Sequence, residues 1–230
     1  MELFEWLSRQ CLDYKRSWDC ATGSGQAAVS LAEHFDEVIA TDVSEEQIRN
    51  SYPHPRITYR IARAEDSGIE RSSVDLITVA TALHWFDQPK FFVEVERVLK
   101  PGGVLAVWSY AGTRATKELD EVLDTFAFET LRDYWPEGAK KNWMGRYRDV
   151  VLPYPAIESP QFYGREHWTL EQLLAYLNSW SAVQNYLGQN GRNPVDTVQA
   201  DLKNNWNADE RQEFRWELWL KVGRKPVLSP

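Results

Sequence analysis

The chain has 230 residues and a formal net charge of −8 at neutral pH, with 26 Lys and Arg residues against 34 Asp and Glu residues. This length accommodates one full α/β domain with additions at its edge, and it leaves little room for a second independent domain. The negative charge argues against a nucleic-acid partner, because binding to a phosphate backbone needs grouped Lys and Arg. We find no signal peptide and no apolar run of about 18 residues, so we expect a cytoplasmic protein that does not associate with membranes.

The two cysteines, Cys11 and Cys20, do not have the spacing of a metal site. Cys20 falls inside a predicted buried strand. We therefore expect no bound metal and a reducing environment.

The first half of the chain alternates between apolar runs of strand length and amphipathic stretches of helical length. Strands that are separated by helices imply right-handed crossovers and a parallel sheet, which binds ligands at the carboxyl ends of its strands. The predicted elements are a helix over 2–13, a strand over 17–21, a helix over 24–35, a strand over 37–42, a short helix opened by a capping box of Ser44 and Gln47, strands over 56–62 and 74–80, a helix over 89–99 and a strand over 104–108.

The second half is richer in tryptophan and more helical. Its predicted helices cover 116–134, 169–187 and 194–206, and two alternating strands over 161–168 and 213–222 are typical of an antiparallel pair at a sheet edge. Trp180 and Tyr186 are expected in its core. A mixed basic and aromatic stretch over 140–148 is typical of a solvated loop, and it also suits an acidic or planar substrate.

A turn of small residues separates the first predicted strand from the next helix. Only small residues such as Ala21, Gly23 and Gly25 let the main chain pass within contact distance of a ligand, and the helix beyond them offers free N–H donors. The second strand ends in Asp42, whose carboxylate can accept both hydroxyls of a ribose. These features predict a nucleotide-cofactor site. The alternative role of Asp42 is to cap the helix that starts near Ser44.

The spacing of this turn does not fit the nicotinamide fingerprint GxGxxG. With Asp19 two residues ahead of the first small position, it resembles motif I of the class I S-adenosylmethionine (SAM) methyltransferases. Ala21 departs from that motif, because it stands where the family usually has its first glycine.

Three further segments resemble the same family and follow in the expected order. Residues 62–69 are similar to the acidic loop beside the adenine. Residues 73–86 are similar to the motif IV strand and its functional tip, and residues 97–103 are similar to the helix and turn that precede the fifth strand.

The resemblance implies a fold and a cofactor. The fold is α/β, a Rossmann-like seven-stranded and mostly parallel sheet with helices on both faces and an antiparallel edge strand. The cofactor is SAM, with S-adenosylhomocysteine as product. The implied cofactor-binding residues are Asp19, Ala21, Thr22, Gly23, Ser24, Gly25, Asp42, Val43, Ala64, Glu65, Thr81 and Ala82. We expect a single methyltransferase domain over 1–230, made of a SAM-binding core over 1–109, substrate-recognition elements over 110–212 and a closing edge strand over 213–222.

Within the family, the chain resembles the type 11 small-molecule group, which includes trans-aconitate methyltransferase-like proteins. That resemblance implies a small-molecule acceptor, with a carboxylate oxygen as the favoured target. Such relatives usually carry an aromatic arm that closes over SAM, whereas 17 residues precede Trp18 here. We therefore expect that the arm is absent, that the partner chain of a homodimer supplies the cover, or that SAM is held more weakly.

The motif IV tip carries the candidate catalytic and substrate-binding residues, His84 and Trp85. His84 would act as a general base for a phenol, an alcohol or a carbon acid, whereas a carboxylate acceptor needs no base. The alternative is a histidine that bonds the main chain or borders the adenine. Trp85 would contact the sulfonium or the substrate, or else pack at the start of a helix.

The acidic residues also have two interpretations each. Asp19 would bind the amino group of the cofactor or hold the glycine turn in place. Glu65 would meet the adenine amine or lie in an exposed loop, and the adjacent Asp66 competes for the same role.

Two other classes of function remain open. A nicotinamide oxidoreductase would share the sheet and Asp42, but it should show GxGxxG spacing and a catalytic pair such as Tyr and Lys. A catalytically silent SAM-fold binding protein would explain the altered first glycine at Ala21.

Overall fold

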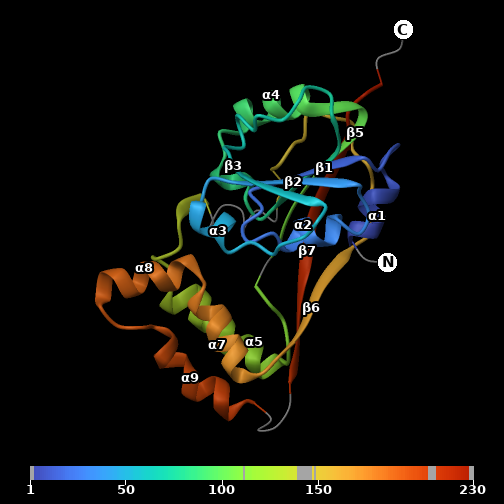
Figure 1. The fold of residues 1–230 in the computed structure, drawn as a ribbon. Coiled ribbons are helices and arrows are strands. Elements are labelled where there is room, and N and C mark those ends of the chain that lie inside the picture. The colour runs from blue at the N-terminus through green and yellow to red at the C-terminus, as the bar shows by residue number, and fades with distance from the viewer. Residues whose placement is uncertain (1–2, 111, 139–146, 148, 207–210, 228–230) are drawn as a thin grey trace. The chain divides into compact units, whose positions relative to one another are not determined.

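The computed structural model describes residues 3–110, 112–138, 147, 149–206 and 211–227 (Figure 1). The chain divides into two units. The first unit contains residues 1–109, 145–162 and 219–230, and the second contains residues 110–144 and 163–218. The single domain over 1–230 expected from the sequence stays a prediction.

The helices and strands follow the predicted alternation closely. In chain order they are α1 (Leu3–Arg9), β1 (Arg16–Cys20), α2 (Gln26–Leu31), β2 (Glu37–Asp42), α3 (Glu45–Arg49), β3 (Ile57–Ile61), β4 (Val74–Ala80), the 3-10 turn η1 (Leu83–Trp85), α4 (Gln88–Val98), β5 (Leu99–Tyr110), α5 (Lys117–Thr125), the π-helical turn η2 (Phe126–Thr130), β6 (Phe162–Trp168), α7 (Leu170–Asn178), α8 (Ser181–Asn190), α9 (Val195–Asn204) and β7 (Gln212–Arg224).

The strands form one seven-stranded sheet in the order β3-β2-β1-β4-β5-β7-β6. The pairs β1–β2, β1–β4, β2–β3 and β4–β5 are parallel. Figure 1 shows α4 on one side of the first five strands, and α2 and α3 on the other. The predicted fold class is confirmed. The strand predicted over 213–222 is β7, which lies between β5 and the outermost strand β6.

The centre of the first unit is the pair of strands β4 and β5. Leu76, Ile77 and Val79 of β4 are fully buried, as are residues 104–107 of β5. Strands that are covered on both faces read as continuous apolar runs, which is the pattern predicted for 74–80. Parallel pairing brings the carboxyl ends of β1, β2 and β4 to the same edge of the sheet, and the predicted site residues follow those ends.

The helix predicted over 169–187 is wrong, because the structure has two helices there, α7 and α8. Trp180 between them has an extended main chain. Asn178 and Ser179 donate side-chain hydrogen bonds to main-chain carbonyls of the preceding turn, which gives the chain an alternative to continuing the helix.

The turn predicted over 100–103 is also wrong, because these residues belong to the start of β5. Gly102 donates its N–H to the carbonyl of Lys225 at 2.9 Å, and Lys225 donates to the carbonyl of Gly103 at 2.9 Å. A main-chain partner more than a hundred residues away in the sequence therefore makes this segment a strand. Local turn signals do not reveal such a partner.

The second unit has its own apolar core, built from α5, η2, α7, α8, α9 and part of β7. Twelve buried side chains form it, and Trp180 and Tyr186 pack against it as expected. Its buried members are Leu119, Leu123, Phe126, Leu131, Leu173, Leu177, Ala182, Val183, Val195, Val198, Leu202 and Phe214.

Among the described residues, no helix is long and apolar enough to cross a membrane.

Candidate functional site

The turn between β1 and α2 has an unusual main-chain conformation. Ala21 and Gly23 have φ angles of 57° and 58°, and Gly25, which caps α2, has a φ of 96°. The left-handed region is open to glycine and strained for alanine, because the side-chain Cβ approaches the carbonyl oxygen. This conformation explains why small residues alternate in the turn. At the position of the family's first glycine the main chain is left-handed, and Ala21 adopts that conformation with strain.

Gly23 and Gly25 serve different purposes. A Cβ atom added to Gly25 would collide with the ring of Tyr59 on β3, so Gly25 is needed for close packing between helix and strand. A Cβ atom added to Gly23 would meet only the side-chain oxygen of Gln47, at 3.8 Å. The main chain at Gly23, unlike that at Gly25, therefore has space that a ligand can approach.

Asp42 joins this turn to the end of β2. Its carboxylate accepts a hydrogen bond from the main-chain N–H of Gly23 at 2.9 Å, and another from the N–H of Ser44 at 2.9 Å. The side chain that caps α3 is Ser44, which accepts from the N–H of Gln47. Each carboxylate oxygen keeps a lone pair beyond these bonds, so Asp42 can hold the turn and still accept further hydrogen bonds.

Asp19 is buried beneath the same turn. Its carboxylate accepts hydrogen bonds from the hydroxyls of Thr22 and of Thr78, the latter at 2.8 Å and on the facing strand β4. Burial raises the pKa of Asp19 from 3.8 to about 6, against the opposing effect of the two hydroxyls. The contact with Thr22 supports the interpretation that Asp19 holds the turn in place.

The loop after β3 contacts the start of α4 through Glu65. One carboxylate oxygen accepts from the main-chain N–H of Asp87 at 2.9 Å, and the other lies 3.5 Å from the Nε atom of Arg63. Ala64 is buried beside it, and Asp66 is exposed. Glu65 therefore has a structural partner and does not lie free in a loop.

Exposed apolar side chains lie at the end of β3 and shortly after β2 and β4, at the carboxyl edge of the sheet. Val43 is 67% exposed, Ile61 is 58% exposed and Trp85 is 64% exposed. Val43 directly follows Asp42 in the chain, and Ile61 pairs with Asp42 in the sheet. Apolar side chains of this kind, next to polar groups, are typical of a site for a planar ligand.

The tip of β4 carries the second cluster of predicted residues. Thr81 has a φ angle of 52° and donates its N–H to the carbonyl of Trp108 at 2.8 Å, while Ala82 is buried. Residues held in such sparsely populated conformations collect at active sites. The strain here lies at the motif IV tip, one residue beyond the strand.

His84 follows in η1 and is partly buried. Burial lowers its pKa from 6.5, so the imidazole is neutral at pH 7. Its ring lies 4.7 Å from the ring of Trp85, and its Nδ1 atom is buried without a hydrogen-bond partner among the described residues. Phe86 packs on Phe91, with ring centroids 4.9 Å apart. Packing therefore explains the aromatic side chain at Phe86. It does not explain the one at Trp85, which is exposed.

The structure brings the predicted residues to one edge of the sheet, within the first unit, in two clusters after β1–β2 and after β3–β4. Sequence reasoning missed Tyr59, which packs on Gly25, and Tyr147, which is buried near Ser109 and Leu83. Tyr59 alternates along its strand like any edge residue, so no pattern marks it. Tyr147 belongs to the stretch 140–148, of which the other residues lie outside the described part of the chain.

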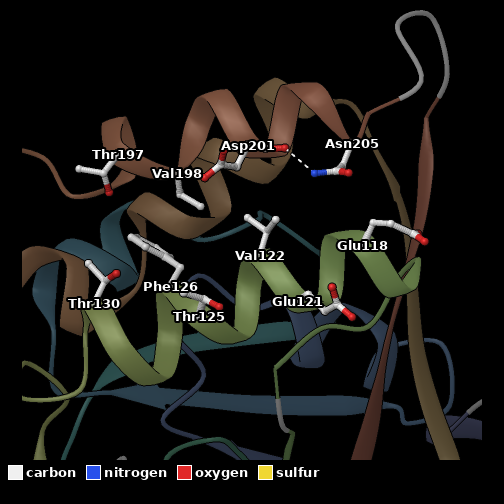
Figure 2. Close-up of a pocket in the computed structure, with 10 residues that line it drawn as sticks. All are labelled: Glu118, Glu121, Val122, Thr125, Phe126, Thr130, Thr197, Val198, Asp201 and Asn205. Atoms are coloured by element: carbon white, nitrogen blue, oxygen red, sulfur yellow. Dashed lines mark hydrogen bonds between the residues drawn. The ribbon is translucent and has the colours of Figure 1, made fainter.

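A pocket of about 370 Å³ lies in the second unit (Figure 2). It is formed by α5 with η2 and by α9, and Figure 2 shows Val122 and Val198 on its facing sides. At one end of the pocket, the side chain of Asn205 donates to the main-chain carbonyl of Asp201 at 2.9 Å. None of the residues predicted to bind SAM lines this pocket. Its lining is Glu118, Glu121, Val122, Thr125, Phe126, Thr130, Thr197, Val198, Asp201 and Asn205.

Comparisons with known proteins match the architecture described above. The methyltransferase domain family of the type 11 group matches residues 18–107. A putative methyltransferase of Dictyostelium discoideum is 32% identical over 207 residues, covering 87% of this chain and 78% of that protein. The chain belongs to the class I SAM-dependent methyltransferases. A probable SAM-dependent methyltransferase of Saccharomyces cerevisiae is 26% identical over 255 residues, covering 90% of this chain and 84% of that protein.

A solved structure supports the same assignment over the whole chain. A putative type II methyltransferase from Anaeromyxobacter dehalogenans has a TM-score of 0.90 and 36% identity, and the match covers 98% of this chain and 96% of that one. The trans-aconitate methyltransferase-like subgroup is not confirmed by these relatives and stays a prediction.

The strained turn yields a prediction for the methyltransferase. Replacing Ala21→Gly removes a left-handed alanine, which costs about 1–2 kcal/mol, and adds about 0.5–1 kcal/mol of chain entropy to the unfolded state. We expect the free energy of unfolding to rise by about 0.5–1 kcal/mol. Ala62→Gly is the matched control, because Ala62 does not have a positive φ angle, and it should lower stability. Chemical denaturation measures both, and a less stable Ala21→Gly protein would contradict the prediction.

The buried carboxylate of Asp19 yields a second prediction. Because its pKa is raised in the folded state, its contribution to stability is complete below about pH 4 and is lost as the pH rises through about 6. The Asp19→Asn variant does not titrate. We expect the wild type to lose on the order of 2–3 kcal/mol relative to this variant between about pH 4 and pH 7.

Urea denaturation at several pH values measures this difference. Glu46→Gln, a change at an exposed carboxylate on α3, controls for the loss of one negative charge. A difference between wild type and Asp19→Asn that does not change with pH would show that Asp19 titrates normally.

Proposed function

We propose that this methyltransferase holds SAM against the turn between β1 and α2 and methylates a small-molecule acceptor, with a carboxylate oxygen as the favoured atom. The observation that carries the proposal is the contact between Asp42 and Gly23, at 2.9 Å. This contact sets a carboxylate beside Gly23, where the main chain of the turn is open to a ligand.

The residues of the site suit the parts of SAM. Asp42 offers oxygen acceptors to the two hydroxyls of a ribose, and the exposed side chains of Val43 and Ile61 offer apolar surface to a purine ring. Ala64 is buried in the loop after β3, and the adjacent Glu65 accepts from the main-chain N–H of Asp87. A carboxylate at Asp42 also suits a cationic ligand. The predicted cofactor-binding set also includes residues after the ends of β1 and β4, which are Thr22, Ser24, Thr81 and Ala82.

SAM supplies a methyl group on a positively charged sulfur, and the chain supplies position and shielding from water. Charge is dispersed when such a methyl group is transferred, so exclusion of water and alignment of the acceptor provide most of the rate enhancement. Trp85 is exposed at the tip of β4 and offers an aromatic face that attracts cations. We assign it a role in substrate binding.

His84 bears on the choice of acceptor. Its lowered pKa keeps the imidazole neutral, so it cannot pair as a cation with a carboxylate. A neutral imidazole is the form that accepts a proton from a phenol or an alcohol. A carboxylate is already ionised at pH 7, so it has no proton for a base to remove. With a carboxylate acceptor, His84 would therefore bind the substrate and would not act as a base.

The cofactor assignment predicts how the Asp42 variants bind SAM. In isothermal titration calorimetry we expect SAM and S-adenosylhomocysteine to bind the wild type, and NAD not to bind. Asp42→Ala removes the acceptors for the ribose, so its affinity for SAM should fall about 10- to 100-fold, at about 1.4 kcal/mol for each factor of ten. Asp42→Asn keeps one oxygen acceptor and should lose less.

Glu46→Ala is the matched control, because it removes an exposed carboxylate from the neighbouring helix α3. Circular dichroism checks that each variant is folded, since Asp42 also holds Gly23 and Ser44. Normal binding by Asp42→Ala would refute the ribose assignment. A folded wild type that binds neither SAM nor its product would support a silent SAM-fold protein.

The acceptor assignment predicts the outcome of a substrate screen. We incubate methyl-labelled SAM with panels of carboxylic acids, phenols and amines, and we expect label in the acids as base-labile esters. The His84→Ala variant should lower the rate by less than about tenfold, because a general base usually contributes about 10²- to 10⁴-fold. Label in phenols alone, together with a loss above that range, would assign His84 as a base and reject the carboxylate.

A further inference from the structure

Two buried polar atoms lie at the carboxyl ends of β4 and β5 without a hydrogen-bond partner among the described residues. They are the Nδ1 atom of His84 and the hydroxyl oxygen of Tyr147. The Tyr147 side chain is only 2% exposed. Buried polar atoms are nearly always bonded, so each exception needs a reason.

The surroundings of Tyr147 place it next to the motif IV tip. Its hydroxyl lies near the side chain of Ser109 at the end of β5 and near the main chain of Leu83, which directly precedes His84. Both neighbours lower its pKa, yet neither completes a hydrogen bond with good geometry. The hydroxyl therefore lies beside the motif IV tip, and its donor has no partner in the part of the chain that the structure describes.

The main chain holds Tyr147 there against a conformational cost. Its φ angle is 53°, a left-handed conformation that is uncommon for a bulky residue and costs about 1–3 kcal/mol. An unpaired buried hydroxyl costs about 1–3 kcal/mol more. Stability alone does not explain both features at one residue.

The ionisation of Tyr147 limits what its hydroxyl does. Burial raises the pKa to about 12, so the hydroxyl stays protonated at neutral pH and cannot act as a base. It is available as a hydrogen-bond donor. The neutral imidazole of His84 carries a single N–H and offers a second donor at Nδ1 in one of its two tautomers.

We propose that the hydroxyl of Tyr147 donates a hydrogen bond to a carboxylate oxygen of the acceptor substrate and so positions the second oxygen for methylation. The proposal rests on the methyl transfer to a small molecule inferred above, and it deepens it by naming a residue that selects the acceptor. A donor suits an ionised acceptor, because hydrogen bonds to a charged oxygen are about twice as strong as neutral ones. No proton leaves the substrate in this arrangement, and Tyr147 keeps its own.

The first test is the stability of Tyr147→Phe, which needs no substrate. This variant keeps the buried ring and removes an unpaired hydroxyl, so its melting temperature should stay the same or rise. Tyr154→Phe is the matched control, because the hydroxyl of Tyr154 donates to Glu96 at 2.8 Å, and its loss should lower the melting temperature by about 2–4 °C. A fall for Tyr147→Phe as large as that for Tyr154→Phe would overturn the proposal, since the hydroxyl would then have a structural partner.

The second test is kinetic and uses methyl-labelled SAM with citrate, itaconate and benzoate, each beside its uncharged amide. For any acid that is methylated, Tyr147→Phe should raise KM and lower kcat/KM about 10- to 100-fold, and it should leave the affinity for SAM in calorimetry unchanged. Tyr154→Phe should change neither value. Equal kcat/KM for wild type and Tyr147→Phe, or methylation of the amides with none of the acids, would overturn the proposal. Failure of the wild type to bind SAM would reject the proposed function itself, and calorimetry detects this before an acceptor is added.

Discussion

The parallel alignment of β1 with β2 and β4 is the constraint on which the candidate site depends. It brings three strand ends to one edge and obliges the chain to turn sharply from β1 into α2 within a few residues. The turn succeeds because Asp42 accepts the N–H of Gly23 from one side and Asp19 binds Thr22 from below. Two carboxylates from neighbouring strands thus fix the turn, Asp42 through a main-chain N–H and Asp19 through the side-chain hydroxyl of Thr22.

The same constraint gives Gly23 and Gly25 different surroundings. Tyr59 reaches the turn from β3 and occupies the space that a side chain at Gly25 would need. Gly23 faces no such neighbour, so its main chain is open. A motif that looks uniform in the sequence therefore contains a position needed for packing and a position whose main chain is open. Ala21 is a third kind, because it adopts the left-handed conformation of a glycine and keeps its methyl group.

Burial favours the neutral forms of three ionisable groups near the strand ends. Burial raises the pKa of Asp19 and of Tyr147, and it lowers the pKa of His84. Methyl transfer from a sulfonium disperses charge, so a site with little water suits it. The residue that connects this property to the proposed acceptor is Tyr147, a donor that stays protonated beside Leu83 and Ser109 and has no hydrogen-bond partner among the described residues.

The sequence by itself determined the order of strands and helices in the first unit, the family and the edge of the sheet where the site residues collect. Those features depend on local periodicity and on short motifs, which neighbouring residues encode. Only the tertiary structure decided that residues 100–103 join β5 through Lys225, that residues 169–187 form two helices, and that Tyr59 and Tyr147 lie where they do. Each of these depends on a contact with a residue far away in the chain or on a side chain competing for the main chain, and neither leaves a periodic pattern.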